Sequence, residues 1–275
     1  MSTTDFTPTL PGHALKRRQL LKAAGIGVAA LGGLTGGPIA AAQTRGYTAP
    51  EGADNFYKSD RVRIRKVKFK NQYSMQVTGN LVSPKGLNAG VRMPAIVVGH
   101  PMGAVKEQSS MLYAQKLAEQ GFVTLAIDLP FWGESEGQPR NLVAPEIYTE
   151  AFSAAVDYLG TQASVDRARI GVLGICGSGG FAISAAKIDP RLKAIATVSM
   201  YDMGAVTRHG LRHAQTVAQR KALLVKAAEQ RDAEFASGKG IFLNYLPAQA
   251  GPETDAVTRE FWEFYRTPRG IAIPP

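Results

Sequence analysis

The sequence predicts an α/β protein, with a mostly parallel sheet and helices on both of its faces. Between residues 94 and 199, short apolar runs alternate with helical segments. The runs are continuously apolar, as in strands that are buried on both faces of a parallel sheet. With 275 residues, the chain is long enough to form one large domain of this class.

The first expected elements alternate polar and apolar residues. Residues 58–70 alternate arginines with valine and isoleucine, and the parity slips at Lys66. This pattern predicts a half-buried strand with a bulge near Arg65. A second alternating strand is expected at 73–82. We interpret the basic face as a solvated sheet edge, and we expect no nucleic-acid binding, because aromatic interleaving and nucleic-acid motifs are missing.

The remaining elements follow in strict order. Turn and helix-end residues bound each of them. Buried strands are expected at 94–99, 122–127, 168–173 and 192–199, and helices at 108–120, 145–159 and 179–188. The alternation then stops, with a polar helical stretch at 205–236 and a last helix at 254–265.

The N-terminus has the layout of an export signal. Lys16-Arg17-Arg18 precedes a weakly apolar, glycine-containing run, and Ala40-Ala41-Ala42 follows as a small-residue cleavage site. The paired arginines resemble a twin-arginine signal. An amphipathic first helix is disfavoured by the glycines. We therefore expect residues 1–42 to engage the export machinery, residues 43–57 to be a linker, and the mature protein to be periplasmic or otherwise exported.

The chain's only cysteine is Cys176, within the run Gly174 to Gly179 at a turn from a strand into a helix. A nucleophile at such a turn lies on a tight bend at the end of the sheet. The helix N-terminus stabilises a thiolate, and the Gly177 N–H would be one donor of an oxyanion hole. The second donor is expected from the loop after residue 99. The Met102 N–H is the first choice and Gly103 the next.

These stretches resemble the α/β-hydrolase superfamily. They are most similar to its cysteine-containing, dienelactone-hydrolase-like and X-Pro-dipeptidyl-peptidase-like bacterial members. The matching motifs are HPMGAVKEQ, AEQGFVTLAIDLPFWGES, VDRARIGVLGICGSGGFAISAA and KAIATVSMYDMG, while EFWEFYRTPRG resembles the lid region. The resemblance implies an α/β-hydrolase core over 58–203 and a helical lid over 204–275. Ser178 departs from it, because the elbow more often has glycine there.

The resemblance implies a hydrolase that acts on a small acyl substrate, an ester, lactone or thioester, through an acyl-enzyme at Cys176. In the family, two strands after the lid bring the acid and the catalytic histidine. No histidine follows His213. The resemblance therefore implies that the last two strands and the base are missing, which leaves an active hydrolase and a catalytically dead, truncated relative as alternatives.

The other candidate residues have two interpretations each. His100 is expected to orient the oxyanion loop, and a role as base is the less favoured alternative. Asp202 is either an active-site carboxylate or a helix N-cap. By resemblance, Glu107 would tune the thiol. His209 and His213 are interpreted as a solvated helix face rather than a metal site.

A third alternative is a dinucleotide-binding oxidoreductase. Residues 177–182 fit the pattern G-x-G-x-x-A, and Asp202 follows the next strand. Such fingerprints usually open their domain, whereas this one follows several strands. We therefore expect neither a cofactor nor a metal. The oligomeric state stays open, with pairing at an exposed edge strand 192–199 as one possibility.

Overall fold

The computed structural model describes residues 56–87, 90–242 and 246–272. The chain divides into two units, residues 1–44 and 45–275, and all described residues belong to the second. The expected export signal and most of the expected linker lie outside the described residues.

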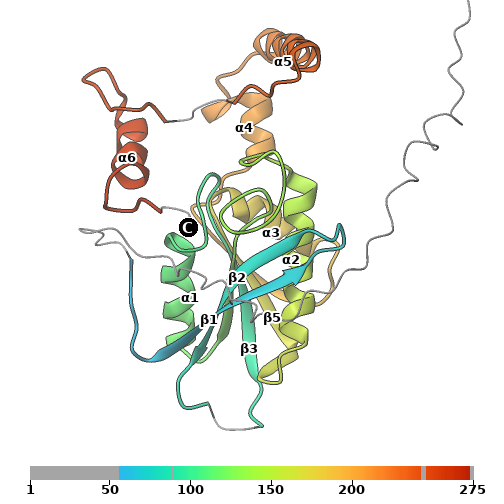
Figure 1. Cartoon of the computed structure of the whole chain (residues 1–275), viewed down its shortest axis with the longest axis vertical. Coiled ribbons are helices and arrows are strands. Elements are labelled where there is room, and N and C mark those ends of the chain that lie inside the picture. The colour runs from blue at the N-terminus through green and yellow to red at the C-terminus, as the bar shows by residue number, and fades with distance from the viewer. Residues whose placement is uncertain (1–55, 88–89, 243–245, 273–275) are drawn as a thin grey trace, which may run out of the picture. The chain divides into compact units, whose positions relative to one another are not determined.

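The core is a six-stranded mixed sheet with the strand order β1-β2-β4-β3-β5-β6 (Figure 1). β1 pairs with β2, and β2 with β4, in antiparallel fashion, whereas the pairs β4-β3, β3-β5 and β5-β6 are parallel. The predicted α/β class and its mostly parallel sheet are confirmed. The strands are β1 (Val62–Lys70), β2 (Gln76–Pro84), β3 (Met93–Gly99), β4 (Val123–Ile127), β5 (Val165–Ile175) and β6 (Leu192–Val198).

Helices cover both faces of the sheet. α1 (Ser109–Glu119) packs on one face, where Met111, Ala114 and Ala118 join an apolar cluster with strand residues. α2 (Pro145–Gly160) and α3 (Gly177–Ala186) pack on the other face. α2 begins with proline in its first turn, a position where the missing N–H costs nothing.

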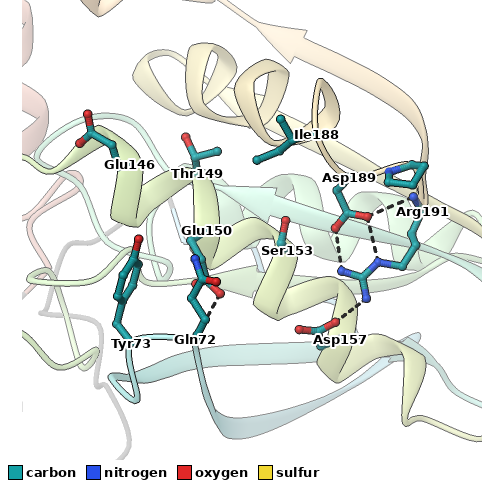
Figure 2. A pocket seen from close by; sticks show the side chains of 11 residues that line it. Gln72, Tyr73, Glu146, Thr149, Glu150, Ser153, Asp157, Ile188, Asp189 and Arg191 are labelled. Carbon is teal, nitrogen blue, oxygen red and sulfur yellow. Dashed lines mark hydrogen bonds and ion pairs between the residues drawn. The ribbon is translucent and has the colours of Figure 1, made fainter.

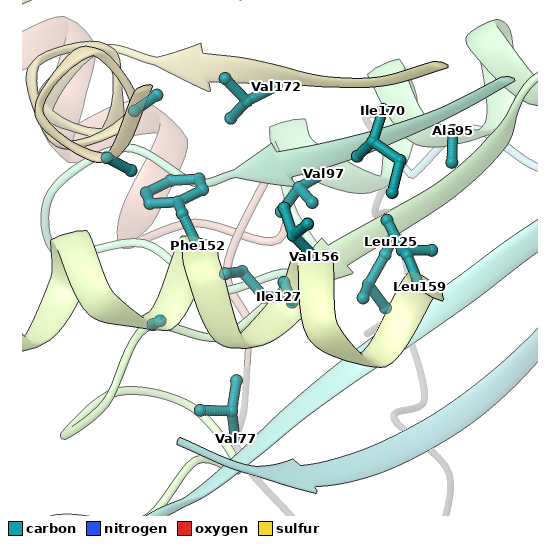
Figure 3. Close-up of a cluster of buried hydrophobic side chains, with 14 of the residues drawn as sticks. Val77, Ala95, Val97, Leu125, Ile127, Phe152, Val156, Leu159, Ile170 and Val172 are labelled. Atoms are coloured by element: carbon teal, nitrogen blue, oxygen red, sulfur yellow. The ribbon is translucent and has the colours of Figure 1, made fainter. Parts of the chain in front are cut away.

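The larger apolar cluster lies between the sheet and α2 (Figure 3). Val97, Leu125 and Ile127 come from the central strands, and Phe152 and Leu159 come from α2. All five are fully buried. Burial of each such side chain stabilises the fold by roughly 1.5–3 kcal/mol, so this cluster holds the carboxyl ends of the strands in place.

The expected bulge near Arg65 is wrong. β1 pairs with β2 in unbroken register, from Val62 opposite Pro84 to Lys70 opposite Gln76. The parity of the apolar residues changes because the strand buries side chains on both of its faces. Val62 joins the cluster on the α1 side, and Val67 joins the cluster on the α2 side.

The polar stretch over 205–236, which was expected to be helical, forms three helical pieces. They are α4 (Met203–His209), the 3-10 turn η1 (Leu211–His213) and α5 (Val217–Ser237). The break lies where Gly210 and Arg212 adopt positive φ angles of 71° and 55°. The last helix is α6 (Ala256–Tyr265). Within the described ranges, every helix is too short or too polar to cross a bilayer.

β6 lies at the edge of the described sheet and pairs only with β5. Its residues from Lys193 to Thr197 are exposed, and the Ile195 side chain keeps 48% of its surface accessible. A largely apolar groove of about 610 Å³ runs beside it, lined from β3, β5, β6 and α1. The expected exposed apolar edge is therefore present in the described structure.

Candidate active site

Cys176 occupies a sharp turn between β5 and α3. Its backbone has φ 54° and ψ −119°, a conformation that side-chain-bearing residues rarely adopt and that costs of order 1–3 kcal/mol. Neighbouring hydrogen bonds hold it there. The Cys176 N–H donates to Val198 O over 2.9 Å, and Cys176 O accepts from Gly179 N and Tyr201 N, each over 3.0 Å. The thiol is partly exposed.

The glycines before and after Cys176 allow the chain to turn so tightly. A Cβ on Gly174 would lie 2.4 Å from Ser178 O, and a Cβ on Gly179 would lie 2.6 Å from Met200 Cγ. Ser178, the departure from the family pattern, is accommodated. It is buried, and its hydroxyl donates to His100 O over 2.5 Å.

The structure brings Gly177 next to Met102. The position of a Cβ on Gly177 lies 3.5 Å from Met102 N and 3.3 Å from Met102 Cβ. Among the described residues, the Met102 N–H makes no hydrogen bond. The next residue, Gly103, has φ 78°, so it turns the loop in a way that favours glycine. The two N–H groups expected to form the oxyanion hole thus belong to adjacent segments.

Both ring nitrogens of His100 contact backbone atoms of the neighbouring loops. Its Nε2 accepts from Leu129 N over 3.0 Å, and its Nδ1 lies 2.7 Å from Pro101 O. This pattern fits a neutral ring that carries its proton on Nδ1. Burial lowers the pKa of His100, which keeps the ring neutral. Neither nitrogen is free to accept a proton from Cys176.

A buried lysine, Lys106, anchors the C-terminal end of the loop after β3 through ion pairs. Lys106 is 0% exposed, and its Nζ lies 2.7 Å from Asp128 Oδ2, 2.6 Å from Glu134 Oε2 and 2.7 Å from Glu107 Oε1. Burial by itself lowers the pKa of Lys106, but the carboxylates of Asp128 and Glu107 outweigh it and raise the pKa. We call these four residues the ion-pair cluster. Glu107, expected near the thiol, places its carboxylate on Lys106.

Three further candidate residues make other contacts. Asp202 is exposed and caps α4, where its carboxylate accepts from Ala205 N over 2.8 Å. The rings of His209 and His213 lie against each other, with centroids 5.3 Å apart. In the part of the chain that the structure describes, no three His, Cys, Asp or Glu side chains are grouped to hold a metal ion.

Tyr265, at the end of α6, is a neighbour of Cys176 that the sequence did not single out. Burial and the neighbouring Cys176 raise the pKa of its hydroxyl to about 12. Gln108 connects the segment after α6 to the oxyanion loop. Its Oε1 accepts from Val105 N over 3.0 Å, and its Nε2 donates to Gly270 O over 2.6 Å. In the sequence, the motif EFWEFYRTPRG, which contains Tyr265 and Gly270, was the signal that could have identified this part of the site.

A surface cavity of about 710 Å³ lies beside α2 and the segment after α3 (Figure 2). Arg191 pairs there with Asp189 over 2.7 Å and with Asp157. Neither this cavity nor the apolar groove beside β6 is lined by Cys176.

The sheet order and the sharp turn between β5 and α3 define the protein as an α/β hydrolase. A family model described as "Dienelactone hydrolase family" matches residues 77–239. The chain therefore belongs to the dienelactone hydrolase family. This membership gives no support to the oxidoreductase alternative.

Two bacterial relatives and one fungal relative illustrate the match. The uncharacterized protein PA2218 of Pseudomonas aeruginosa is 46% identical over 215 residues, which cover 78% of this chain and 57% of that protein. The uncharacterized protein YcjY of Escherichia coli K12 is 38% identical over 206 residues, which cover 74% of this chain and 67% of that protein. Thiohydrolase aneE of Aspergillus aculeatus is 39% identical over 105 residues, covering 38% of this chain and 33% of that protein.

Solved structures agree with the fold. The crystal structure of PA2218 matches with a TM-score of 0.75 and 43% identity over 82% of this chain and 70% of that one. The α/β hydrolase GrgF from Penicillium has a TM-score of 0.59 and 21% identity, over 74% and 66% of the two chains, and supports the fold alone.

Proposed function

We propose that the protein hydrolyses carboxylic esters, lactones or thioesters with Cys176 as the nucleophile. The observation that carries this proposal is the strained turn at Cys176, which is followed by Gly177 facing the unpaired Met102 N–H. A strained backbone at a sheet's carboxyl end is typical of a residue held for chemistry.

In the proposed reaction, the Cys176 thiolate attacks the substrate carbonyl and forms an S–C bond. The carbonyl electron pair moves to oxygen, where the Gly177 and Met102 N–H groups stabilise the negative charge. Collapse of this intermediate expels an alcoholate or thiolate, which takes a proton from solvent. Water then cleaves the acyl-enzyme and restores the thiol.

Thioesters are the first substrates to test, because the relative aneE is described as a thiohydrolase. His100 would act by orienting the oxyanion loop, since both of its ring nitrogens are engaged. Asp202 would act as a helix cap, given its bond to Ala205 N. Tyr265 would border the thiol from the lid.

A second candidate is a catalytically inactive relative. Among the described residues, no hydrogen bond joins a histidine to Cys176, and both ring nitrogens of His100 are engaged in the loop. Without a base to activate water, the acyl-enzyme would form and persist. The two candidates therefore differ in deacylation.

The experiment measures release of p-nitrophenolate from p-nitrophenyl acetate by the purified chain. Continuous turnover supports the hydrolase, and one equivalent followed by a halt supports the inactive relative. Cys176→Ala must abolish both signals, while Cys176→Ser is the matched control that keeps the shape of the side chain. Release that survives Cys176→Ala refutes Cys176 as the nucleophile.

We also propose that the protein is exported through its twin-arginine-type N-terminus and acts on small acyl molecules in the periplasm. The support is the order of charged, apolar and small residues over 1–42. We further propose that the exposed β6 edge allows chains to associate, because in the described sheet β6 pairs only with β5 and its apolar side chains are exposed.

A further inference from the structure

Lys106 is the charged residue whose placement most needs an explanation. It is completely buried, and its ammonium has three protons for three carboxylates, those of Asp128, Glu107 and Glu134, at 2.6–2.7 Å. Each of its donors is therefore matched to an acceptor. Glu107 is the next residue of the same loop, whereas Asp128 and Glu134 both come from the segment after β4.

The backbone around Lys106 is held in place as well as its side chain. The Lys106 N–H donates to Asp128 Oδ1 over 2.8 Å, and the Glu134 N–H donates to Asp128 Oδ2 over 2.9 Å. Asp128 follows β4 directly and is fully buried. The cluster thus joins the loop after β3 to the loop after β4.

The same loop is held at its other end by His100, which accepts from Leu129 N. Leu129 is the residue after Asp128, so both ends of the loop are fixed to one short stretch of chain. Met102 lies between the two attachments and faces Gly177.

We propose that Lys106 is a positioning residue for acyl transfer, which holds the loop so that the Met102 N–H points at the oxyanion formed at Cys176. This inference rests on the proposed function. Lys106 is completely buried among its carboxylate partners, and it acts through the backbone of its own loop.

Stability alone does not account for the lysine. A buried ion pair is often no more stabilising than apolar side chains of similar volume, because desolvation offsets the attraction. The ion pairs with Asp128 and Glu134 instead hold the loop against the segment after β4. An oxyanion donor has to lie 2.7–3.1 Å from the developing charge, so small displacements of the loop weaken it.

The experiment compares two reactions of Cys176 in the full chain. Acetylation by p-nitrophenyl acetate develops an oxyanion, and its rate is measured from the burst of p-nitrophenolate. Alkylation by iodoacetamide forms an S–C bond, expels iodide and develops no oxyanion. In Lys106→Met, we expect acetylation to slow by about tenfold to a hundredfold, below the 10²–10³-fold loss for complete removal of a donor. Alkylation should stay within about twofold, because it reports only the thiolate and its access.

Lys66→Met is the matched control. Lys66 pairs with Glu134 Oε1 over 2.6 Å from β1 and does not belong to the oxyanion loop. We expect this variant to retain both rates. Acetylation that is unchanged in Lys106→Met, or that falls together with alkylation, overturns the proposal.

A charge-balanced variant covers the case in which Lys106→Met does not fold. Lys106→Met combined with Asp128→Asn removes one charge of each sign, and the same selective loss of acetylation is expected. If this variant also fails to fold, the lysine serves folding and the proposal is wrong. A wild-type chain that is alkylated but never acetylated refutes the proposed function itself, and the inference falls with it.

Discussion

The Leu129 N–H donates to Nε2 of His100 over 3.0 Å, which leaves the imidazole proton on Nδ1 beside Pro101 O. This single bond joins the loop after β4 to the loop after β3. It also engages Nε2, and a nitrogen that accepts a backbone hydrogen bond is unavailable as a base.

The first prediction concerns pH. Burial lowers the pKa of His100, so between the unfolded value of about 6.5 and the lower folded value the unfolded chain binds the extra proton. The contribution of His100 to stability is complete above about pH 6.5 and is lost as the pH falls below it, by up to about 1.4 kcal/mol per pH unit. Urea unfolding between about pH 7.5 and 5.5 measures this loss.

His100→Gln is the control for this prediction. It removes the titrating ring, so we expect its free energy of unfolding to change less over the same pH interval. An identical pH dependence in both proteins would mean that other groups cause the effect.

The second prediction concerns Gly174. A Cβ there would lie 2.4 Å from Ser178 O, a backbone atom that cannot move aside without opening the turn. We expect Gly174→Ala to lower the free energy of unfolding by about 1–3 kcal/mol, the range for an overpacked interior. Gly251→Ala is the control, because a Cβ there meets nothing within 4 Å, and its effect should stay within about 0.5 kcal/mol. Equal effects of the two variants, measured by urea unfolding, contradict the tight turn.

The third prediction concerns the β6 edge. If chains pair there, a charge at Ile195 should oppose association, because it would be buried against an apolar groove. We expect Ile195→Lys to lower concentration-dependent self-association, as measured by sedimentation velocity. Val217→Lys, on the exposed face of α5, is the matched control and should leave association unchanged. Association that is insensitive to Ile195→Lys removes β6 from the interface.

The fourth prediction concerns export. Twin-arginine signals depend on the arginine pair, so Arg17→Lys with Arg18→Lys should leave the uncleaved precursor in the cytoplasm. Lys22→Arg, which keeps the charge of the region, should be exported as before. Cell fractionation and the mass of the mature chain measure both outcomes, and cleavage after Ala42 is expected. Export of the double variant rules out this route.

Local patterns were sufficient for most of the core. Continuous apolar runs identified β3, β4 and β5 because strands that are buried on both faces of a sheet are continuously apolar. The run at β6 identified that strand as well, although its residues from Lys193 to Thr197 are exposed. Likewise, glycines around Cys176 indicated the sharp turn, since a Cβ on Gly174 would lie only 2.4–2.6 Å from backbone atoms of Ser178 and Gly179. The alternating pattern of β1 was misinterpreted as a bulge, because sequence parity does not say that two separate clusters receive Val62 and Val67.

The candidate site also has features that local sequence predicted and features that it did not. The sequence by itself determined the class of fold, the place of Cys176 and the nearby loop with Met102, because these depend on residues adjacent along the chain. Only the tertiary structure decided the partners of Lys106 and His100. Asp128 and Glu134 lie 22 and 28 residues away from Lys106, and the approach of Tyr265 depends on a helix from the end of the chain. Such contacts are set by how strands are ordered in the sheet, and no local periodicity encodes that order.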